Sequence, residues 1–289
     1  FVSKIVETAM NNQLQQHFNE NKLLSTYQSA YRKGHSVESA LTHVYSSLLK
    51  ELDRGRSVFL IMLDLSAAFD TVSHERLLHI LDSRFGLKSK ALSLIQSYLS
   101  DRVSSVKVRS TLSSARRTNV GVPQGSILGP VFFNCLMSQL PSLLSIIGIS
   151  SHIYADDTQF WVSFLPENED VARRQVQRAF TIVTKFMLDN SLQLNPNKTQ
   201  FLPISRSTES FEPLDLGDGT IISPSSHVKN LGVVFDSKFC FQNHASEIRR
   251  SGFFHLRRVK ALGSIIPSDC LEKLIHAYVT SRIDFCNIL

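Results

Sequence analysis

The chain has few cysteines, no long apolar run and no zinc-binding pattern, and each of these absences excludes a class of protein. The four cysteines, Cys135, Cys240, Cys270 and Cys286, are too far apart for a Cys-x-x-Cys metal or redox motif, and the ten histidines show no zinc-finger spacing. The most apolar stretch, residues 143–149, is far shorter than the roughly 20 residues of a membrane-spanning helix, and no signal peptide is recognisable. We therefore expect cysteines that pack as small apolar side chains, no membrane partner, and a soluble protein in a reducing compartment.

What is present is the composition of an ordinary folded domain with an excess of positive charge. Of the 289 residues, 43% are hydrophobic and 19% are charged, and the formal net charge is +6. This charge favours a polyanionic partner, although a solvated surface explains either basic cluster equally well. The clusters are Arg102, Lys107, Arg109, Arg116 and Arg117, and then Arg249, Arg250, Arg257, Arg258 and Lys260. The chain begins with Phe1, and we expect it to be a piece of a longer protein.

Hydrophobic periodicity predicts an α/β (α+β) protein in which strands and helices alternate in the middle and helices flank both ends. Helices are predicted over residues 3–18, 36–52, 73–85, 88–99, 131–140 and 167–189, and the part after residue 235 is predicted to be helical and basic. Strands are predicted over residues 58–63, 103–109, 153–162 (as a hairpin), 201–204 and 231–235. The Ser-, Pro-, Asp- and Gly-rich residues 205–219 are predicted to form a mobile loop.

Three aspartates stand at the ends of apolar, strand-forming runs. Asp64 follows the run 59–63, and Asp156 and Asp157 occupy the tip of the predicted hairpin. An ionised carboxylate in such a place is costly unless a cation compensates it. Mg²⁺ takes oxygen ligands and keeps positions for substrate phosphates, so the three carboxylates suit two-metal phosphoryl transfer. A single aspartate after a strand is more often a turn or helix cap, and the other two carboxylates are what single out Asp64.

A bulky ring and two further acids follow Asp64 closely. Phe69 lies five positions on, where its ring would fill the space that a ribose 2′-hydroxyl needs. Asp70 is expected to order the turn into the helix that starts at Ser73, and Glu75 suits the positive end of that helix. We therefore leave both acids out of the predicted metal site.

Several segments resemble, in order along the chain, the motifs of reverse transcriptases, and their wording is closest to non-LTR (LINE-type) retrotransposons. Five successive motifs are matched by residues 64–70 (DLSAAFD), 121–130 (GVPQGSILGP), 154–157 (YADD), 194–199 (LNPNKT) and 231–233 (LGV). Two more segments, residues 28–36 (QSAYRKGHS) and 281–287 (SRIDFCN), also resemble that group. One such motif would be weak evidence, but all of them in order over nearly the whole chain are specific.

The resemblance implies a right-hand polymerase fold with an antiparallel palm sheet packed on helices. It implies partial fingers over residues 1–56, a palm over 57–238 with a fingers-like insertion near 86–118, and the start of a helical thumb over 239–289. The implied activity is that of an RNA-directed DNA polymerase that serves retrotransposition by target-primed reverse transcription. The implied partners are an RNA template, a DNA primer or RNA–DNA hybrid, and dNTPs, in the nucleus after a cytoplasmic ribonucleoprotein stage.

The resemblance also implies roles for individual residues. Asp64, Asp156 and Asp157 would hold two Mg²⁺ ions, with Mn²⁺ as an alternative, and Lys198 would be a catalytic cation near the pyrophosphate. The positions implied to bind the nucleotide are Leu65 through its carbonyl, Phe69 as a steric gate against ribonucleotides, Gln124 and Gly125. The positions implied to bind nucleic acid are Arg32, Tyr154, Leu231 and Gly232.

The chain also departs from the family in one respect. Reverse transcriptases of this group carry an upstream Arg-Pro element whose arginine grips the triphosphate, and this chain contains no Arg-Pro pair. We therefore expect incomplete fingers, and no endonuclease or ribonuclease H region is recognisable. Two alternatives stay open: a catalytically inactive nucleic-acid-binding remnant, and an RNA-dependent RNA polymerase, against which Phe69 argues.

Overall fold

The computed structural model describes residues 2–66, 68–207, 210–263 and 265–289. Its helices are α1 (Val2–Glu20), α2 (Val37–Asp53), α3 (His74–Ser83), α4 (Ser89–Leu99), α5 (Leu128–Met137), α6 (Leu140–Ile146), α7 (Glu169–Asp189), α8 (Gln242–Ala261), α9 (Ser268–Ile275) and α10 (Ser281–Asp284), with short turns η1 (Pro166–Asn168), η2 (Pro196–Lys198) and η3 (His276–Thr280). Its strands are β1 (Ser57–Leu63), β2 (Leu65–Ser66), β3 (Val103–Ser104), β4 (Lys107–Val108), β5 (Thr111–Leu112), β6 (Arg116–Arg117), β7 (Ser150–Tyr154), β8 (Asp157–Phe164), β9 (Gln193–Leu194), β10 (Gln200–Ile204), β11 (Leu214–Asp215), β12 (Ile221–Ile222), β13 (His227–Asn230) and β14 (Val233–Asp236).

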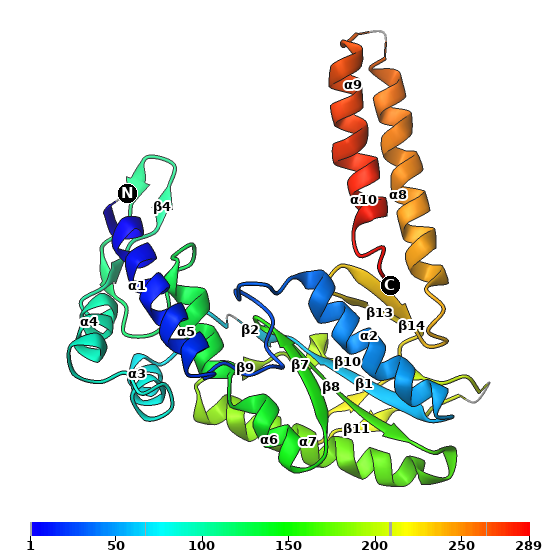
Figure 1. The fold of residues 1–289 in the computed structure, drawn as a ribbon, viewed down its shortest axis with the longest axis horizontal. Coiled ribbons are helices and arrows are strands. Elements are labelled where there is room, and N and C mark those ends of the chain that lie inside the picture. The colour runs from blue at the N-terminus through cyan, green and yellow to red at the C-terminus, as the bar shows by residue number, and fades with distance from the viewer. Residues whose placement is uncertain (1, 67, 208–209, 264) are drawn as a thin grey trace.

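A four-stranded antiparallel sheet forms the centre of the molecule, in the order β10-β1-β8-β7 (Figure 1). Its central strand β1 is the apolar run SVFLIML, in which six of seven residues are buried. An unbroken apolar run suits this position because a strand covered on both faces has no solvent-facing side. The sheet pairs segments far apart in sequence, since Leu60 lies between Trp161 of β8 and Leu202 of β10.

Alternate side chains of β1 enter two separate hydrophobic cores. Phe59 and Ile61 pack into a large core with α3, α5, α6 and α7, whereas Val58 and Leu60 pack into a smaller core with α2 and the β13–β14 hairpin. This division follows from the two-residue period of a strand. In Figure 1, α2 accordingly crosses one face of the sheet, and α6 and α7 lie along the other.

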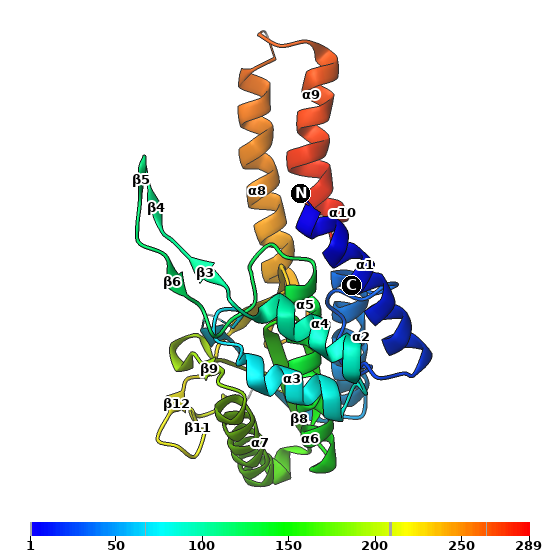
Figure 2. The same ribbon diagram turned by 90° about the vertical axis from the view of Figure 1, so that its left-hand side faces the viewer.

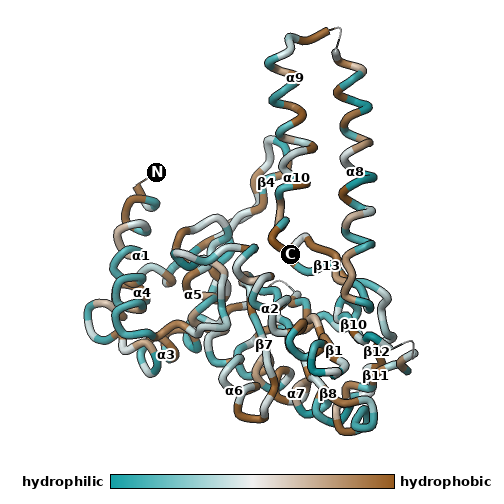
Figure 3. The backbone as a smooth tube through the Cα atoms, turned by 45° about the vertical axis from the view of Figure 1, so that its right-hand side comes forward, coloured by the Kyte–Doolittle hydropathy of each residue, from teal (hydrophilic) through white to brown (hydrophobic). Residues whose placement is uncertain are grey.

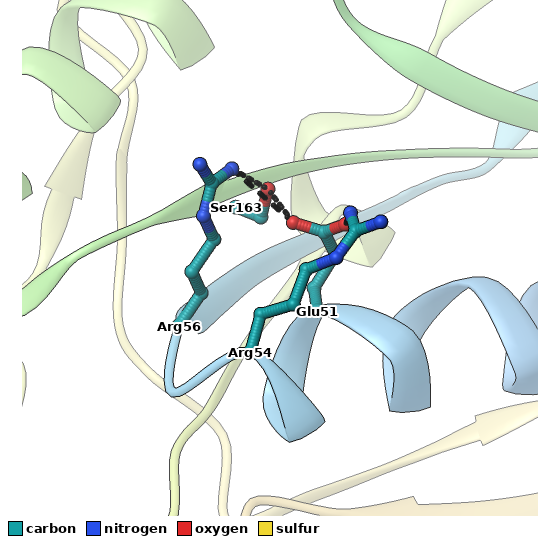
Figure 4. A network of polar contacts seen from close by, with 4 residues as sticks. All are labelled: Glu51, Arg54, Arg56 and Ser163. Atoms are coloured by element: carbon teal, nitrogen blue, oxygen red, sulfur yellow. Dashed lines mark hydrogen bonds and ion pairs between the residues drawn. The ribbon is translucent and has the colours of Figure 1, made fainter.

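Helix α2 is tied down at both ends by polar contacts. At its start, the Ser36 side chain accepts a hydrogen bond from the Ser39 amide and the Ser39 side chain accepts one from the Ser36 amide, which completes a capping box. Near its end, Glu51 accepts hydrogen bonds from Ser163 of β8 at 2.7 Å and from Arg56 at 3.3 Å (Figure 4). Burial by itself raises the pKa of Glu51. The Ser163 hydrogen bond and the neighbouring arginines together have the larger, opposite effect, so the pKa is lowered overall.

Two arms project from this body in the same direction (Figure 2). One is the exposed ribbon in which β3 pairs with β6 and β4 pairs with β5. The other is the long helical hairpin of α8 and α9, along which hydrophilic and hydrophobic residues alternate (Figure 3). After α10 the chain returns to the base of this hairpin, where Cys286 is buried in the smaller core. No helix in the described part of the chain is long and apolar enough to cross a bilayer.

Most predicted helices are present, but the helix predicted over residues 131–140 is wrong in its extent. Helix α5 starts at Leu128 and ends at Met137, and a second helix, α6, begins at Leu140 with Pro141 in its first turn. Proline lacks an amide hydrogen and has a fixed φ, so it is suited to starting a helix. The predicted strand over residues 103–109 is also not continuous, because β3 and β4 are separate steps of the twisted ribbon.

Three further predictions, for the strand 231–235, the cysteines and the loop 205–219, need correction. The strand predicted over residues 231–235 starts at Val233, because Leu231 and Gly232 form the β13–β14 turn with left-handed φ values of 45° and 94°. Cys240 and Cys270 are exposed, and the expected packing as small apolar residues holds for Cys135 and Cys286. Within the predicted loop 205–219, β11 forms and Leu214 and Leu216 are buried, while positions 208–209 lie outside the described residues.

Candidate active site

The three aspartates of the sequence motifs meet at one end of the two central strands. Asp64 directly follows β1, and Asp157 begins β8. In the antiparallel register Leu63 pairs with Thr158, and one further step places Asp64 across from Asp157. Asp156 stands at the tip of the β7–β8 hairpin, where Tyr154 pairs with Asp157 and Ala155 adopts a left-handed φ of 58°. The predicted hairpin with two carboxylates at its tip is confirmed.

Asp64 and Asp156 lie close enough to Asp157 to influence its protonation. Partial burial, and then the negative charges of Asp156 and Asp64, raise the pKa of Asp157, although its side chain stays accessible to solvent. A cluster of this kind favours a bound cation, because a cation offsets the repulsion among the acids.

Asp64 has one oxygen that is suited to a metal ion. Its Oδ2 is buried and accepts no hydrogen bond, and it lies 3.3 Å from Nζ of Lys198 in an ion pair. Its main-chain carbonyl accepts a hydrogen bond from the Asn195 amide at 2.9 Å. This bond, next to the β2–β9 pair, joins the motif segments 64–70 and 194–199. In the described residues no three His, Cys, Asp or Glu side chains enclose an ion by themselves. A metal here therefore needs water or substrate oxygens to complete its ligands, as Mg²⁺ sites on phosphates do.

A second wall of the site joins residues 69–72 to residues 121–124. The Phe69 ring packs against that of Phe133 in a tilted arrangement with centroids 4.7 Å apart, and the Phe69 carbonyl accepts a hydrogen bond from the Val122 amide at 2.8 Å. Gly121 has a φ of 85°, and a Cβ at this position would stand 2.8 Å from a main-chain oxygen, so the close approach requires glycine. Together these contacts hold the Phe69 ring in one place beside the strand that ends at Asp64.

Asp70 belongs to the same wall, but its role differs from the one predicted. Its carboxylate accepts hydrogen bonds from Nε2 of Gln124 at 3.1 and 3.2 Å. The helix start that Asp70 was expected to order is capped by Ser73, whose Oγ accepts from the Arg76 amide. Asp70 thus orients Gln124, one of the predicted nucleotide-binding residues.

The family to which these segments point is shown by sequence comparison. The sequence profile described as "Reverse transcriptase (RNA-dependent DNA polymerase)" matches residues 1–235, which include every carboxylate of the site. The chain belongs to the reverse transcriptase family.

Its relatives are polymerases of non-LTR mobile elements, as the resemblance in the sequence motifs predicts. The reverse transcriptase chain is 28% identical over 275 residues to the probable RNA-directed DNA polymerase from transposon BS of Drosophila melanogaster, which covers 90% of the chain and 29% of that relative. It is 24% identical to the RNA-directed DNA polymerase from mobile element jockey of the same species, with 86% and 27% covered. It is 26% identical to the Pol polyprotein from type-1 retrotransposable element R2 of Nasonia vitripennis, with 91% and 27% covered. The chain thus spans less than a third of each of these relatives.

Solved structures confirm the predicted fold class. Apo telomerase from Candida tropicalis, truncated from its C-terminal domain, superposes with a TM-score of 0.56 at 14% identity, over 80% of this chain and 44% of that one. Telomerase from Candida albicans, in complex with a fragment of telomeric RNA, superposes with a TM-score of 0.53, over 99% and 49% of the two chains. The reverse transcriptase domain therefore has a right-hand polymerase fold built on an antiparallel palm sheet.

The remaining predicted site residues lie in different surroundings. Leu65 is buried in β2, Gly125 is exposed with a left-handed φ of 76°, and Leu231 and Gly232 form the hairpin turn described above. The guanidinium of Arg32 donates to the main-chain carbonyls of Ser25 and, at 2.9 Å, Gln28, and burial lowers its pKa. In this structure Arg32 therefore braces its own loop.

Residues 27–30, of which Tyr27 is exposed and 28–30 are buried, form a strap on the outer edge of β7, a position that the sequence motifs did not reveal. The Ile153 amide donates to the Tyr27 carbonyl at 2.8 Å, and the Ser29 amide donates to the Ile153 carbonyl at 3.1 Å. On the other side of the strap, Gln28 donates to Oδ1 of Asn134 in α5 at 3.0 Å. The signal in the sequence was Asn134, a polar residue inside the otherwise apolar helix α5, because a buried amide side chain requires a hydrogen-bond partner.

The strap also contacts a buried histidine whose surroundings lower its pKa. His152 of β7 lies 2.9 Å from the Ser29 hydroxyl through Nε2, and its ring centroid is 5.0 Å from that of His43 on α2. Burial, followed by the nearby His43 and His35, lowers the pKa of His152 from 6.5 to about 4.

We expect stability to fall as the pH is lowered from 6.5 towards about 4, the window set by the ordinary and folded pKa values of His152. Within that window the unfolded chain binds a proton at His152 that the folded chain does not, so acid favours unfolding, by about 3 kcal/mol at most. Urea unfolding at several pH values measures the slope. His152→Gln keeps a hydrogen-bonding side chain but does not titrate, so its slope should be shallower, and equal slopes would contradict the assignment.

Proposed function

We propose that this domain catalyses RNA-templated DNA synthesis, extending a primer 3′-hydroxyl with deoxynucleoside triphosphates. The observation that carries the proposal is the meeting of Asp64, Asp156 and Asp157 at one end of neighbouring central strands, in a chain whose relatives are named RNA-directed DNA polymerases. Because the chain spans less than a third of those relatives, their whole-protein activity is a further part of the proposal. For the longer protein we propose retrotransposition by target-primed reverse transcription in the nucleus.

The site residues fit the chemistry of phosphoryl transfer. Two Mg²⁺ ions held by the three carboxylates would, when bound, promote loss of the 3′-hydroxyl proton and neutralise charge on the triphosphate. Lys198 reaches Asp64 from a largely exposed position, with 66% of its side chain accessible. Its ammonium can therefore also turn towards a pyrophosphate, steady the developing charge and donate a proton.

We assign nucleotide selection to the wall formed by residues 69–72 and 121–124. The Phe69 ring, held against Phe133, would exclude a 2′-hydroxyl, and Gln124, oriented by Asp70, would contact the sugar side of the nucleotide. Gly125 is exposed and a side chain there would meet nothing within 4 Å, so a base or template strand can approach its backbone closely.

The positive arms suit an RNA template and a DNA primer. The β3–β6 ribbon carries exposed Arg116 and Arg117, and a groove of about 680 Å³ at the base of the α8–α9 hairpin is lined by Lys229, Arg250 and Arg282. We propose that these residues contact phosphates, beside a primer-gripping turn at residues 231–232. Binding should then weaken steeply with salt, with a log–log slope of roughly one for each phosphate contact.

Primer extension tests the function directly. We expect the chain to extend a labelled DNA primer on an RNA template with dNTPs and Mg²⁺, and the Asp156→Asn, Asp157→Asn double variant to add no nucleotide, because both carboxylates lose their charge. A filter-binding assay alongside it checks that both proteins hold the primer–template equally. If the chain binds but stays silent, even when extended at its N-terminus by the corresponding residues of a relative, the inactive remnant becomes the better explanation.

A further inference from the structure

Tyr31 is an exposed aromatic residue in a strained backbone conformation next to the carboxylate site. Its φ is 57°, in the left-handed region that a bulky residue rarely adopts. Its side chain is 53% exposed, although the three residues before it are buried. Strain of this kind persists where the surrounding structure enforces it, and it occurs preferentially at functional sites.

The surroundings do enforce it, through hydrogen bonds on both sides of Tyr31. The Ala30 carbonyl accepts from Nδ2 of Asn134 at 2.6 Å, and the Ala30 amide donates to Oε1 of Gln28 at 3.3 Å. After Tyr31, the Arg32 guanidinium is bonded back to the Gln28 carbonyl at 2.9 Å, and the His35 amide donates to the Arg32 carbonyl at 3.2 Å. The tyrosine ring is therefore held outwards by a rigid frame that does not include the ring itself.

The strap sets where this ring lies. Gln28 bridges Ile153 in parallel, and the Ser29 amide donates to the Ile153 carbonyl, so the strap runs towards the hairpin tip and Tyr31 follows it on that side. Burial, followed by the charges of Asp156 and Tyr154, raises the pKa of Tyr31, which agrees with that placement. Tyr31 is thus an exposed ring at the end of the strap that lies towards Asp156.

We propose that the Tyr31 ring stacks on the terminal base of the primer and so holds the 3′ end beside Asp156. Every base offers a flat face to an aromatic ring, which makes such a contact independent of sequence. The inference rests on the proposed polymerase function, because it assigns the ring to that reaction's primer.

Photocrosslinking tests the contact without requiring synthesis. A dideoxy-terminated primer carrying 5-iodouracil as its terminal base is annealed to an RNA template, bound to the chain and irradiated. We expect the crosslink to map to the peptide that contains Tyr31. Tyr31→Phe should keep it, Tyr31→Ala should lose it, and Tyr27→Ala is the matched control, since Tyr27 is a 41% exposed tyrosine of the same segment whose ring faces His43. A crosslink that persists in Tyr31→Ala, or none in the unsubstituted chain, overturns the proposal.

Kinetics separate this inference from the polymerase function. In primer extension Tyr31→Ala should raise KM for primer–template about tenfold, with Tyr31→Phe close to the unsubstituted chain, as loss of one stacked base predicts. If the unsubstituted chain extends primers and Tyr31→Ala has the same KM, the Tyr31 contact is refuted and the polymerase function stands. If the chain never extends a primer but crosslinks through Tyr31, the polymerase function fails while the contact stands.

Discussion

Asp64→Asn should reduce primer extension about a thousandfold or more while the domain stays folded. In the proposed mechanism this carboxylate, directly after β1, is a metal ligand, and its buried Oδ2 accepts no hydrogen bond and is paired only with the exposed ammonium of Lys198. A bound metal contributes several kcal/mol to stabilising the transition state, and each 1.4 kcal/mol is a factor of about ten in rate. Single-turnover extension at saturating dNTP measures the loss.

The same substitution should leave stability unchanged or slightly higher. Asp64 adds to the negative charge that raises the pKa of Asp157, so removing it relieves repulsion, and Lys198 is exposed enough for water to replace its lost partner. Glu75→Gln is the matched control, since it also removes one negative charge, from an exposed position in the first turn of α3. If Asp64→Asn extends primers within tenfold of the unsubstituted chain, or if Glu75→Gln fails equally, Asp64 is not a metal ligand.

Local sequence patterns predicted those parts of the fold in which a residue's conformation is set by the residues next to it in the sequence. The continuous apolar run of β1, the Ser36 cap of α2 and the hairpin around Asp156 were all readable in this way. The turn at Leu231 and Gly232 was not, because leucine gives no signal for a left-handed φ. Packing of Leu231 into the smaller core and of Phe285 against Gly232, where an added Cβ would stand 2.9 Å from the ring, sets that turn from outside the segment.

The candidate site shows the same limit. The three aspartates could be found because each follows a strand signal and because their motifs occur in family order. The partners that orient the site could not, since Gln124 is 54 positions from Asp70 and the strap reaches β7 from more than 100 positions away. Such contacts follow from the tertiary packing of segments that are distant in sequence, which periodicity does not specify.

Phe69→Ala should lower discrimination against ribonucleotides about a hundredfold, the range expected when an apolar wall rejects one added hydroxyl. The ring is half-buried against Phe133, and the Val122 amide holds its main chain, so it cannot swing aside for a larger sugar. Truncation to alanine opens the space that a 2′-hydroxyl requires. The ratio of kcat/KM for dCTP to that for CTP, measured on one RNA template, checks this.

Loss of an aromatic ring from the core also affects packing, so the control must share that loss. Phe211 is partly buried and packs on the same large core, with its ring centroid 5.5 Å from that of Phe59. In the sequence it comes after all three aspartates of the site. Phe211→Ala should reduce stability but keep the discrimination ratio, because no nucleotide contact is assigned to it. If the dCTP to CTP ratio is unchanged in Phe69→Ala, Phe69 is not the residue that excludes ribonucleotides. An unsubstituted chain that already uses CTP as well as dCTP would instead favour an RNA polymerase, because a gate that tolerates the 2′-hydroxyl selects nothing.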